Sequence, residues 1–447
     1  MEIKLTYEVV KLNESQLGML YHCLDEENPR QYTLQRLFKS NLKFDKKIFI
    51  ETLRYLLLIH PAMKSKLSID SGSVLIDLDE ENFFEVEWCE KVRKVEEISQ
   101  ISKKDFERGF NLNNETVLIR FKIIPSNDCD YLLITNHHIL MDGWSSNILL
   151  EDLINIYSIF LEGLDTSRLE GDIIRGNKNF KAYNCYINSF SSENILDGID
   201  IFWKKYLKDI NVSSILCKTK NLNNDCGIGR RTHKFSKNIV STLKEHSINN
   251  RVTLNSILET LLGITFNFLS GGTTDTVFCK VTSGRHVDID GVDEIFGSLI
   301  NTIPCRICYD SEDALLDAVK NNYKNNITSL YYSHVPVRTL LKYTDLNELP
   351  ECLFSFENYR KTPSNAKSSS LHLKKLSTYE ETSFPLSINC FLDNNKLIFE
   401  LEYKQNLVSE YTIEAFLDKL IYVTNCFVQN PSLRIKDLDI TLPEERL

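Results

Sequence analysis

The sequence predicts a mixed α/β chain, of the α+β kind, built from two lobes of comparable size. Its 447 residues are enough for two or three hydrophobic cores. Segments with helical periodicity alternate with segments of strand periodicity in both halves. The polar stretch 165–179, "DTSRLEGDIIRGNKN", is the best candidate for a linker. We therefore expect lobes at 1–175 and 176–447.

The first half contains clear start and stop signals. Asp45 is a favourable N-cap for an apolar helical segment, and Pro61 ends that segment. Two strands are expected to flank the turn "PSNDC", and Gly163 is expected to stop the long helix that follows them. The predicted elements are a strand at 2–10, a helix ending at Leu24, a helix at 44–63, strands at 117–124 and 130–138, and a helix at 144–163.

The second half repeats this mixture of helices and strands. The segment 360–375 is rich in Ser, Lys and Asn and is expected to be mobile. The predicted helices lie at 196–208, 237–247, 254–269, 311–323 and 410–428, and the predicted strands at 274–282, 299–308, 351–357, 385–392 and 396–404.

Composition excludes several classes of function. The chain is 42% hydrophobic and 26% charged, which is typical of a soluble globular protein. Its net charge of −10 and its lack of basic runs argue against nucleic-acid binding. No stretch reaches the ~18 uninterrupted apolar residues of a membrane helix, and the N-terminus does not resemble a secretory signal. We expect a cytoplasmic protein without membrane contact.

Cysteine usage points to reduced thiols rather than to a metal site. The chain has twelve scattered cysteines, which are expected to act as small core residues. The pair Cys305 and Cys308 has CxxC spacing, but no second CxxC or HxxxH completes a zinc set. No metal site is expected.

Two adjacent histidines stand out in "YLLITNHHILMDGWSS". Because side chains alternate along a strand, His137 and His138 are expected to point to opposite faces. They therefore cannot readily bind one metal ion, and one should face a cleft while the other is buried. Periodicity leaves open which one, because neither face of the strand is cleanly polar.

Asp142 and Gly143 have the chemistry of a turn followed by a helix start. One interpretation is a capped turn beside two hydrogen-bonded histidines. The other is general base catalysis, in which a neutral imidazole accepts a proton from an attacking amine or hydroxyl. The chain has no G-x-S-x-G elbow and no cysteine with a catalytic signature, so direct transfer is favoured over a covalent acyl-enzyme.

The segment "HHILMDGWS" resembles the HHxxxDG signature of condensation domains of nonribosomal peptide synthetases, within the chloramphenicol acetyltransferase-like superfamily. Further segments resemble this family in its order, and the resemblance covers essentially the whole chain. "FKAYNCYI" is only weakly similar and lacks the family's usual aspartate. The other similar segments are "LNESQLGMLYHCL", "HPAMKSKL", "TLNSILETLLGITFNFLSGGTTDTVFCKVTSGR", "IFGSLINTIPCRI", "YYSHVPV", "LFSFENY" and "SFPLSI".

This resemblance implies two chloramphenicol acetyltransferase-like lobes that form a V-shaped pseudo-dimer with a central tunnel. The N-terminal lobe would carry HHxxxDG, and the C-terminal lobe the latch and floor-loop segments. His138 would face the tunnel as the base or as an orienter of the amine, and His137 would be structural. Asp142 would pair with Arg285 of "SGR", and Gly143 would leave room for the donor arm.

Three further residues are implied to line the tunnel or contact substrate: Trp144, Ser145 and Asn301. A backbone-bonding strand residue is an equally good interpretation of Asn301. For Arg285 alone, without the resemblance, an exposed loop arginine would be the better interpretation.

The resemblance also implies partners. Donor and acceptor carrier domains would each supply a phosphopantetheine arm, so that no cofactor is bound intrinsically. Upstream or downstream synthetase modules are further expected partners. The wording of "SQLGMLYH" and "HHILMDGW" resembles domains that accept a D-configured donor residue. Three competing interpretations are an epimerisation domain, a free-standing acyltransferase that uses a soluble amine, alcohol or coenzyme A thioester, and a non-catalytic scaffold.

Overall fold

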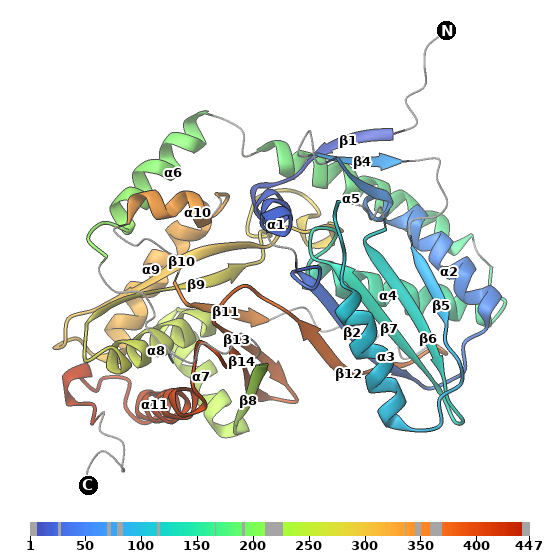
Figure 1. Ribbon diagram of the computed structural model, residues 1–447. Helices are drawn as coiled ribbons and strands as arrows, with labels where there is room; N and C mark the ends of the chain where they lie inside the picture. The colour runs from blue at the N-terminus through green and yellow to red at the C-terminus, as the bar shows by residue number, and fades with distance from the viewer. Residues whose placement is uncertain are drawn as a thin grey trace. The chain divides into compact units, whose positions relative to one another are not determined.

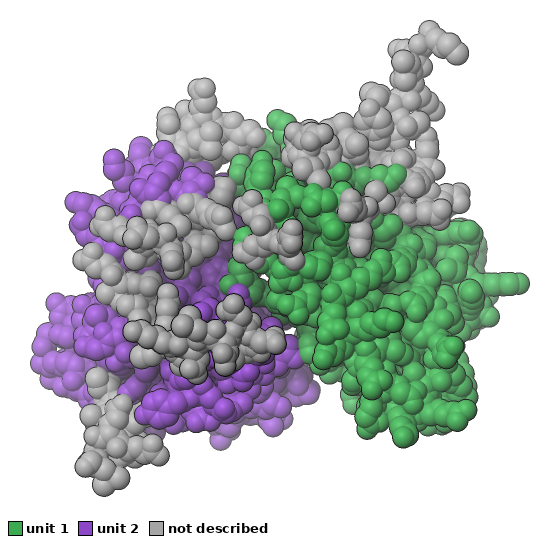
Figure 2. Space-filling view, viewed as in Figure 1, with its two compact units in different colours: residues 1–191, 287–300, 359–383 green, residues 192–286, 301–358, 384–447 purple. Residues whose placement is uncertain are grey.

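The structure, a computed structural model, divides into two compact units (Figure 2). Unit 1 comprises Met1–Ser191, Val287–Ile300 and Tyr359–Ser383. Unit 2 comprises Ser192–His286, Asn301–Asn358 and Phe384–Leu447. The residues that the structure describes are 7–25, 28–68, 73–77, 84–113, 117–165, 167–189, 193–210, 227–335, 337–344, 350–357 and 369–439.

Unit 1 is organised around a five-stranded sheet with the order β12-β2-β7-β6-β5 (Figure 1). Its neighbours pair antiparallel except for β5 and β6, which run parallel. A smaller sheet has the order β1-β4-β3. The strands of unit 1 are β1 (Tyr7–Lys11), β2 (Thr33–Ser40), β3 (Ser65–Ser68), β4 (Ser73–Asp77), β5 (Glu85–Trp88), β6 (Ile119–Pro125), β7 (Asp130–His137) and β12 (Leu373–Glu380).

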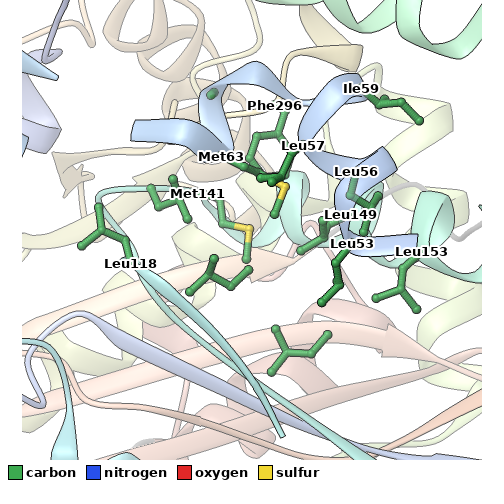
Figure 3. Packing of buried hydrophobic residues seen from close by; sticks show 14 of the residues in the cluster. Leu53, Leu56, Leu57, Ile59, Met63, Leu118, Met141, Leu149, Leu153 and Phe296 are labelled. Carbon is green, nitrogen blue, oxygen red and sulfur yellow. The ribbon is translucent and has the colours of Figure 1, made fainter. Parts of the chain in front are cut away.

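The helices of unit 1 pack apolar faces that the sequence spaces at helical intervals. Asp45 caps α2 by accepting hydrogen bonds from the amides of Lys47 and Ile48. Leucines of α2 and α4 share one core, shown in Figure 3. The helices are α1 (Glu14–Asp25), α2 (Lys46–Ile59), α3 (Val95–Arg108), α4 (Gly143–Leu161) and α5 (Arg168–Ser189), with short 3-10 helices at Pro61–Lys64 and Val292–Glu294.

Unit 2 contains a six-stranded sheet with the order β10-β9-β11-β13-β14-β8. The central strand β11 runs parallel to both of its neighbours, and the other pairs are antiparallel. The strands are β8 (Ile228–Phe235), β9 (Asp275–Thr282), β10 (Asn301–Cys308), β11 (Cys352–Glu357), β13 (Leu386–Asp393) and β14 (Lys396–Lys404).

Helix α8 is the most buried helix of unit 2, and it carries a charge into the core. Glu259 of α8 is completely buried, and its carboxylate lies 3.1 Å from the ammonium of Lys280 on β9. The pair satisfies charges that could not be buried singly. The helices of unit 2 are α6 (Glu193–Tyr206), α7 (Lys237–Asn250), α8 (Leu254–Leu269), α9 (Leu315–Tyr331), α10 (Val337–Leu340) and α11 (Glu410–Gln429), with 3-10 helices at Leu341–Tyr343 and Ile435–Asp437.

In the part of the chain that the structure describes, no single helix is long and apolar enough to cross a membrane. Helices α7 and α8 pass that test only as a pair, and the chain bends by 109° between them.

Most predicted elements are confirmed. The predicted helix at 44–63 is α2 with its N-cap, and the predicted strands around "PSNDC" are β6 and β7. The helices and strands predicted in the second half correspond to α6 to α9, α11, β9 to β11, β13 and β14, with α9 displaced toward its C-terminus. Residues 2–6 of the first predicted strand and 360–368 of the segment expected to be mobile lie outside the described residues. The elements that were not predicted are strands β2, β3, β4, β5, β8 and β12 and helices α3, α5 and α10.

The prediction of a linker at 165–179 is wrong, because α5 runs through it from Arg168 to Ser189. The expected lobe boundary at 175/176 lies inside this helix, and unit 1 includes all of α5. The polarity of the segment was the misleading signal. A Cβ on Gly176 would lie 1.9 Å from the carbonyl oxygen of Ile59, so this glycine permits α5 to pack closely against the end of α2.

The two glycines of α5 make a matched pair for a test of this packing. Gly176→Ala is expected to lower the free energy of unfolding by about 1–3 kcal/mol, because the new methyl group meets rigid backbone. A Cβ on Gly171 would meet nothing within 4 Å, so Gly171→Ala should raise it by up to about 1 kcal/mol. Urea denaturation followed by circular dichroism measures both. Equal effects of the two substitutions would contradict the close contact.

Candidate active site

The two histidines lie where β7 gives way to α4. Strand β7 ends at His137, and the connection that follows leads to Asp142, the N-cap of α4. The amide of His138 donates to the carbonyl oxygen of Tyr32 at 2.8 Å, which holds the main chain beside the start of β2. Tyr32 has φ +55°, in the left-handed region that costs a bulky residue about 1–2 kcal/mol. The backbone around His138 is thus held in a strained but defined position.

His137 is sealed in the core of unit 1. Its Nδ1 accepts a hydrogen bond from the amide of Ile139 at 3.1 Å, and its Nε2 lies 3.5 Å from Sγ of Cys23. The rings of Tyr32 and Phe110 lie against it. Burial, and then the charge of His138, lower the pKa of His137 to about 3. A neutral imidazole with its Nδ1 occupied in this way cannot serve as a base near neutral pH.

His138 points to the other side of the sheet. Its Nε2 lies 3.1 Å from Oε1 of Glu380, with side-chain exposures of 6% for His138 and 36% for Glu380. The contact lies off the axis of a hydrogen bond. Neither ring nitrogen of His138 has an aligned hydrogen-bond partner among the described residues. His138 is therefore a buried imidazole beside the carboxylate of a partly exposed glutamate.

The charges around His138 favour its protonated form. Burial lowers the pKa of His138, but the carboxylates of Glu380 and Asp142 raise it by more, and the net shift is upward. Burial likewise raises the pKa of Glu380, while His138 and then Arg36 bring it below its ordinary value. The two shifts are consistent with an imidazolium–carboxylate pair.

Sheet register explains why Glu380 reaches this point. On β12, Glu380 is opposite Leu34 of β2, and Leu34 is opposite Asn136 of β7. Residues opposite each other in a sheet share a face, and His138 follows Asn136 by two residues. Glu380 and His138 therefore lie on one face of the sheet.

Glu380 is the residue that sequence reasoning missed. It lies at the end of β12, in a strand that was not predicted and just beyond the segment expected to be mobile. Strand β12 is at the edge of its sheet and most of its side chains are at least partly exposed, so no alternation of apolar and polar residues marks it. Only the pairing register of β12 with β2 shows that Glu380 lies near His138, and this register cannot be read from the sequence.

Asp142 is completely buried and holds two parts of unit 1 together. Its Oδ1 accepts from the amide of Ser145 at 2.8 Å, which caps α4, and its Oδ2 accepts from the amide of Leu299 at 3.1 Å. Ser145 adds a second link, because its hydroxyl donates to the carbonyl oxygen of Gly297 at 2.7 Å. Gly143 is the first residue of α4 and is partly exposed. The turn is thereby joined to the segment 287–300.

Trp144 lies away from the histidines. Its Nε1 donates to the carbonyl oxygen of Asp293 at 2.8 Å, and its ring lines a cavity of about 290 Å³ in unit 1. His60 and Arg175 line the same cavity, but His138 does not. We therefore do not assign the reaction to this cavity.

Arg285 and Asn301 belong to unit 2. Arg285 is buried, and its Nη1 donates to the carbonyl oxygen of Ser283 at 3.2 Å. Asn301 begins β10, and its Nδ2 donates to carbonyl oxygens of Ser333 and Val335. These contacts of Asn301 are those of a backbone-bonding residue. The pairing of Asp142 with Arg285 and the place of Asn301 in a tunnel would involve both units and stay predictions.

Comparison with known proteins identifies the family. The sequence profile of the condensation domain matches residues 7–446. Bacitracin synthase 3 of Bacillus licheniformis is 24% identical over 98% of this chain, and the match covers 7% of that protein. Gramicidin S synthase 2 of Brevibacillus brevis is 24% identical over 98% of this chain, and the match covers 10% of that protein. The chain thus spans only a small part of these curated relatives.

Solved structures agree on the fold. A four-domain nonribosomal peptide synthetase bound to AMP and glycine matches with a TM-score of 0.77 at 17% identity, over 100% of this chain and 35% of that chain. The first condensation domain of the calcium-dependent antibiotic synthetase matches with a TM-score of 0.73 at 11% identity, over 97% and 99%. The epimerization domain from the third module of tyrocidine synthetase B matches with a TM-score of 0.71 at 16% identity, over 95% and 98%.

These likenesses confirm the expected chloramphenicol acetyltransferase-like fold, whereas the V shape and the tunnel between the lobes stay predictions. The fold alone does not separate condensation from epimerisation, because domains of both kinds match it. The sequence profile of the condensation domain covers nearly the whole chain. The chain belongs to the condensation domain family of nonribosomal peptide synthetases.

Proposed function

We propose that this chain forms an amide bond between two carrier-bound substrates. The amine of an aminoacyl group on an acceptor carrier attacks the thioester of an acyl or peptidyl group on a donor carrier. Family membership supports this reaction. The observation that carries the proposal is the placement of His138, whose Nε2 lies beside a partly exposed carboxylate while His137 is enclosed in the core.

The reaction needs a proton to move but no oxidant or reductant. The amine nitrogen bonds to the thioester carbon, the carbon–sulfur bond breaks, and the thiol leaves with the proton that the nitrogen loses. In its neutral form His138 accepts that proton from nitrogen and returns it to sulfur, a role worth about 10²–10⁴ in rate. Holding both substrates in one site supplies the remaining proximity.

Two carrier domains are the proposed partners, and their phosphopantetheine arms enter as parts of the substrates. Gly143 has no side chain to obstruct the donor arm, and Trp144 and Ser145 follow it at the start of α4. Asn301 keeps its proposed place in the tunnel wall, and the proposed pairing of Asp142 with Arg285 supports the turn that carries the histidines. A D-configured donor residue and neighbouring synthetase modules are part of the same proposal.

The proposed location is the cytoplasm. Ten cysteines are described as free thiols, and five of them are buried. Free thiols in this number are typical of a reducing compartment.

The position of Glu380 argues against its acting with His138 as the two acid/base groups of an epimerisation. Inversion of an α-carbon by two acid/base groups requires these groups on opposite faces of the carbon. Atoms 3.1 Å apart, as Nε2 of His138 and Oε1 of Glu380 are, leave no room for a carbon between them. Because the proposed condensation breaks no bond at the α-carbon, deuterium from solvent should not enter the α-position of a carrier-bound aminoacyl group incubated with this chain.

A free-standing acyltransferase and a non-catalytic scaffold each predict a different result with loaded carriers. An acyltransferase that acts on a soluble amine, alcohol or coenzyme A thioester would form product without one of the carriers. A non-catalytic scaffold would bind the loaded carriers but form no product. Intact-mass analysis of two loaded carriers, each also omitted in turn, separates these cases from carrier-dependent condensation.

His138→Ala is expected to lower the rate of condensation by about 10²–10⁴, because the proton acceptor is lost. The rate is measured by intact mass with both carriers loaded. His372→Ala is the matched control, since His372 is an exposed histidine of the same unit and lies outside the candidate site. Near-normal turnover of His138→Ala would refute the assignment.

Asp142→Ala is expected to act on stability. The substitution removes the N-cap of α4 and leaves the amide of Leu299 without its acceptor, at a combined cost of about 2–4 kcal/mol in the free energy of unfolding. Urea denaturation measures the loss. Asp142→Asn keeps one carbonyl-type oxygen as an acceptor and should lose less. Full stability of Asp142→Ala would show that Asp142 does not hold the turn.

A further inference from the structure

Glu380 lies outside the sequence signature, yet its carboxylate is placed against the ring that the proposed reaction uses. It comes from β12, far from His138 in sequence, and pairing with β2 brings it to the site. Figure 1 shows β12, coloured as a late part of the chain, beside the early strand β2. The contact is made within unit 1, between Nε2 of His138 and Oε1 of Glu380.

Several charged groups surround His138, and Glu380 is the one whose carboxylate has a direct contact with the ring. From β2, the positive charge of Arg36 lowers the pKa of His138, and its Nη2 donates to Oδ1 of Asn136 and to Oγ of Ser146. From the start of α4, Asp142 contributes a negative charge, but its two oxygens are bound to backbone amides. From its own segment, His137 is neutral and buried. Glu380 is thus the one carboxylate among these groups that lies against the ring itself.

We propose that Glu380 is a positioning residue for this reaction, attracting the Nε2 edge of the His138 ring by its charge and stabilising the protonated form of the ring. The inference rests on the proposed function, because it takes His138 as the proton acceptor. Glu380 acts through His138 and takes no proton itself. His138 must be neutral to accept a proton from the amine. Because Glu380 favours the protonated ring, the chain is active only at a pH high enough for His138 to lose its proton.

The sign of the effect follows from the charges. Glu380 and Asp142 raise the pKa of His138, whereas burial lowers it. Removal of the charge of Glu380 takes away the larger of the two raising effects, so the pKa of His138 should fall. The neutral base is then available at lower pH, so the acidic limb of the pH profile of kcat/KM should move to lower pH.

Glu380→Gln is the test variant, because it keeps the shape of the side chain and removes its charge. Glu380→Asp is the conservative variant, which keeps the charge and should retain part of the effect. Glu381→Gln is the matched control. Glu381 is the next residue along the chain, and its carboxylate pairs with Arg30 at 3.3 Å rather than with His138.

The first measurement needs no activity. Histidine labelled at Cε1 is incorporated into the full chain, and the signal of His138 is assigned among nine histidines by its loss in His138→Ala. Its titration is expected to move to lower pH in Glu380→Gln and to stay in place in Glu381→Gln. An unmoved titration in Glu380→Gln would overturn the inference, whether or not the chain condenses substrates.

The second measurement is the pH profile of kcat/KM with two loaded carriers. The acidic limb is expected to move to lower pH in Glu380→Gln, to move back toward the parent in Glu380→Asp, and to stay in place in Glu381→Gln. A titration that moves while the limb does not would overturn a role of Glu380 in the reaction. Failure of the proposed function is seen separately, as full turnover by His138→Ala.

Discussion

At the end of β7, consecutive side chains must point to opposite sides of the sheet, and this constraint separates His137 from His138. One ring enters the core, where Ile139 and Cys23 engage its nitrogens. The ring of His138 lies on the opposite face, next to Glu380 of the edge strand β12. Because of this strand order, His137 and His138 are adjacent in the sequence but have different surroundings and different chemistry.

Burial alone does not decide what a histidine can do. Both rings are buried, and desolvation lowers the pKa of each. For His137 nothing opposes this effect, and its pKa falls to about 3. For His138 the carboxylates of Glu380 and Asp142 outweigh it, and the pKa rises. Glu380, the larger of these two contributions, is carried by a strand that lies late in the sequence.

Asp142 and Ser145 hold the turn between β7 and α4 in place. Asp142 joins the start of α4 to the segment 287–300 through two backbone amides, and Ser145 adds contacts to the same segment. A buried carboxylate that accepts two amide hydrogen bonds is costly to misplace, because any shift leaves polar groups unpaired. The sequence indicated Asp142 as a turn residue, but its link to Leu299 spans more than a hundred residues and no local pattern indicates it.

The features that could be predicted from the sequence alone are those that follow local rules. Helical spacing, the cap at Asp45 and strand alternation predicted most elements, and strand geometry separated the two histidines without any knowledge of the fold. The tertiary structure alone decided that the glycine-containing segment 168–189 is a helix, because Gly176 packs against Ile59. It alone brought Glu380 to His138, because the register of an edge strand depends on the partner it joins and not on its own residues.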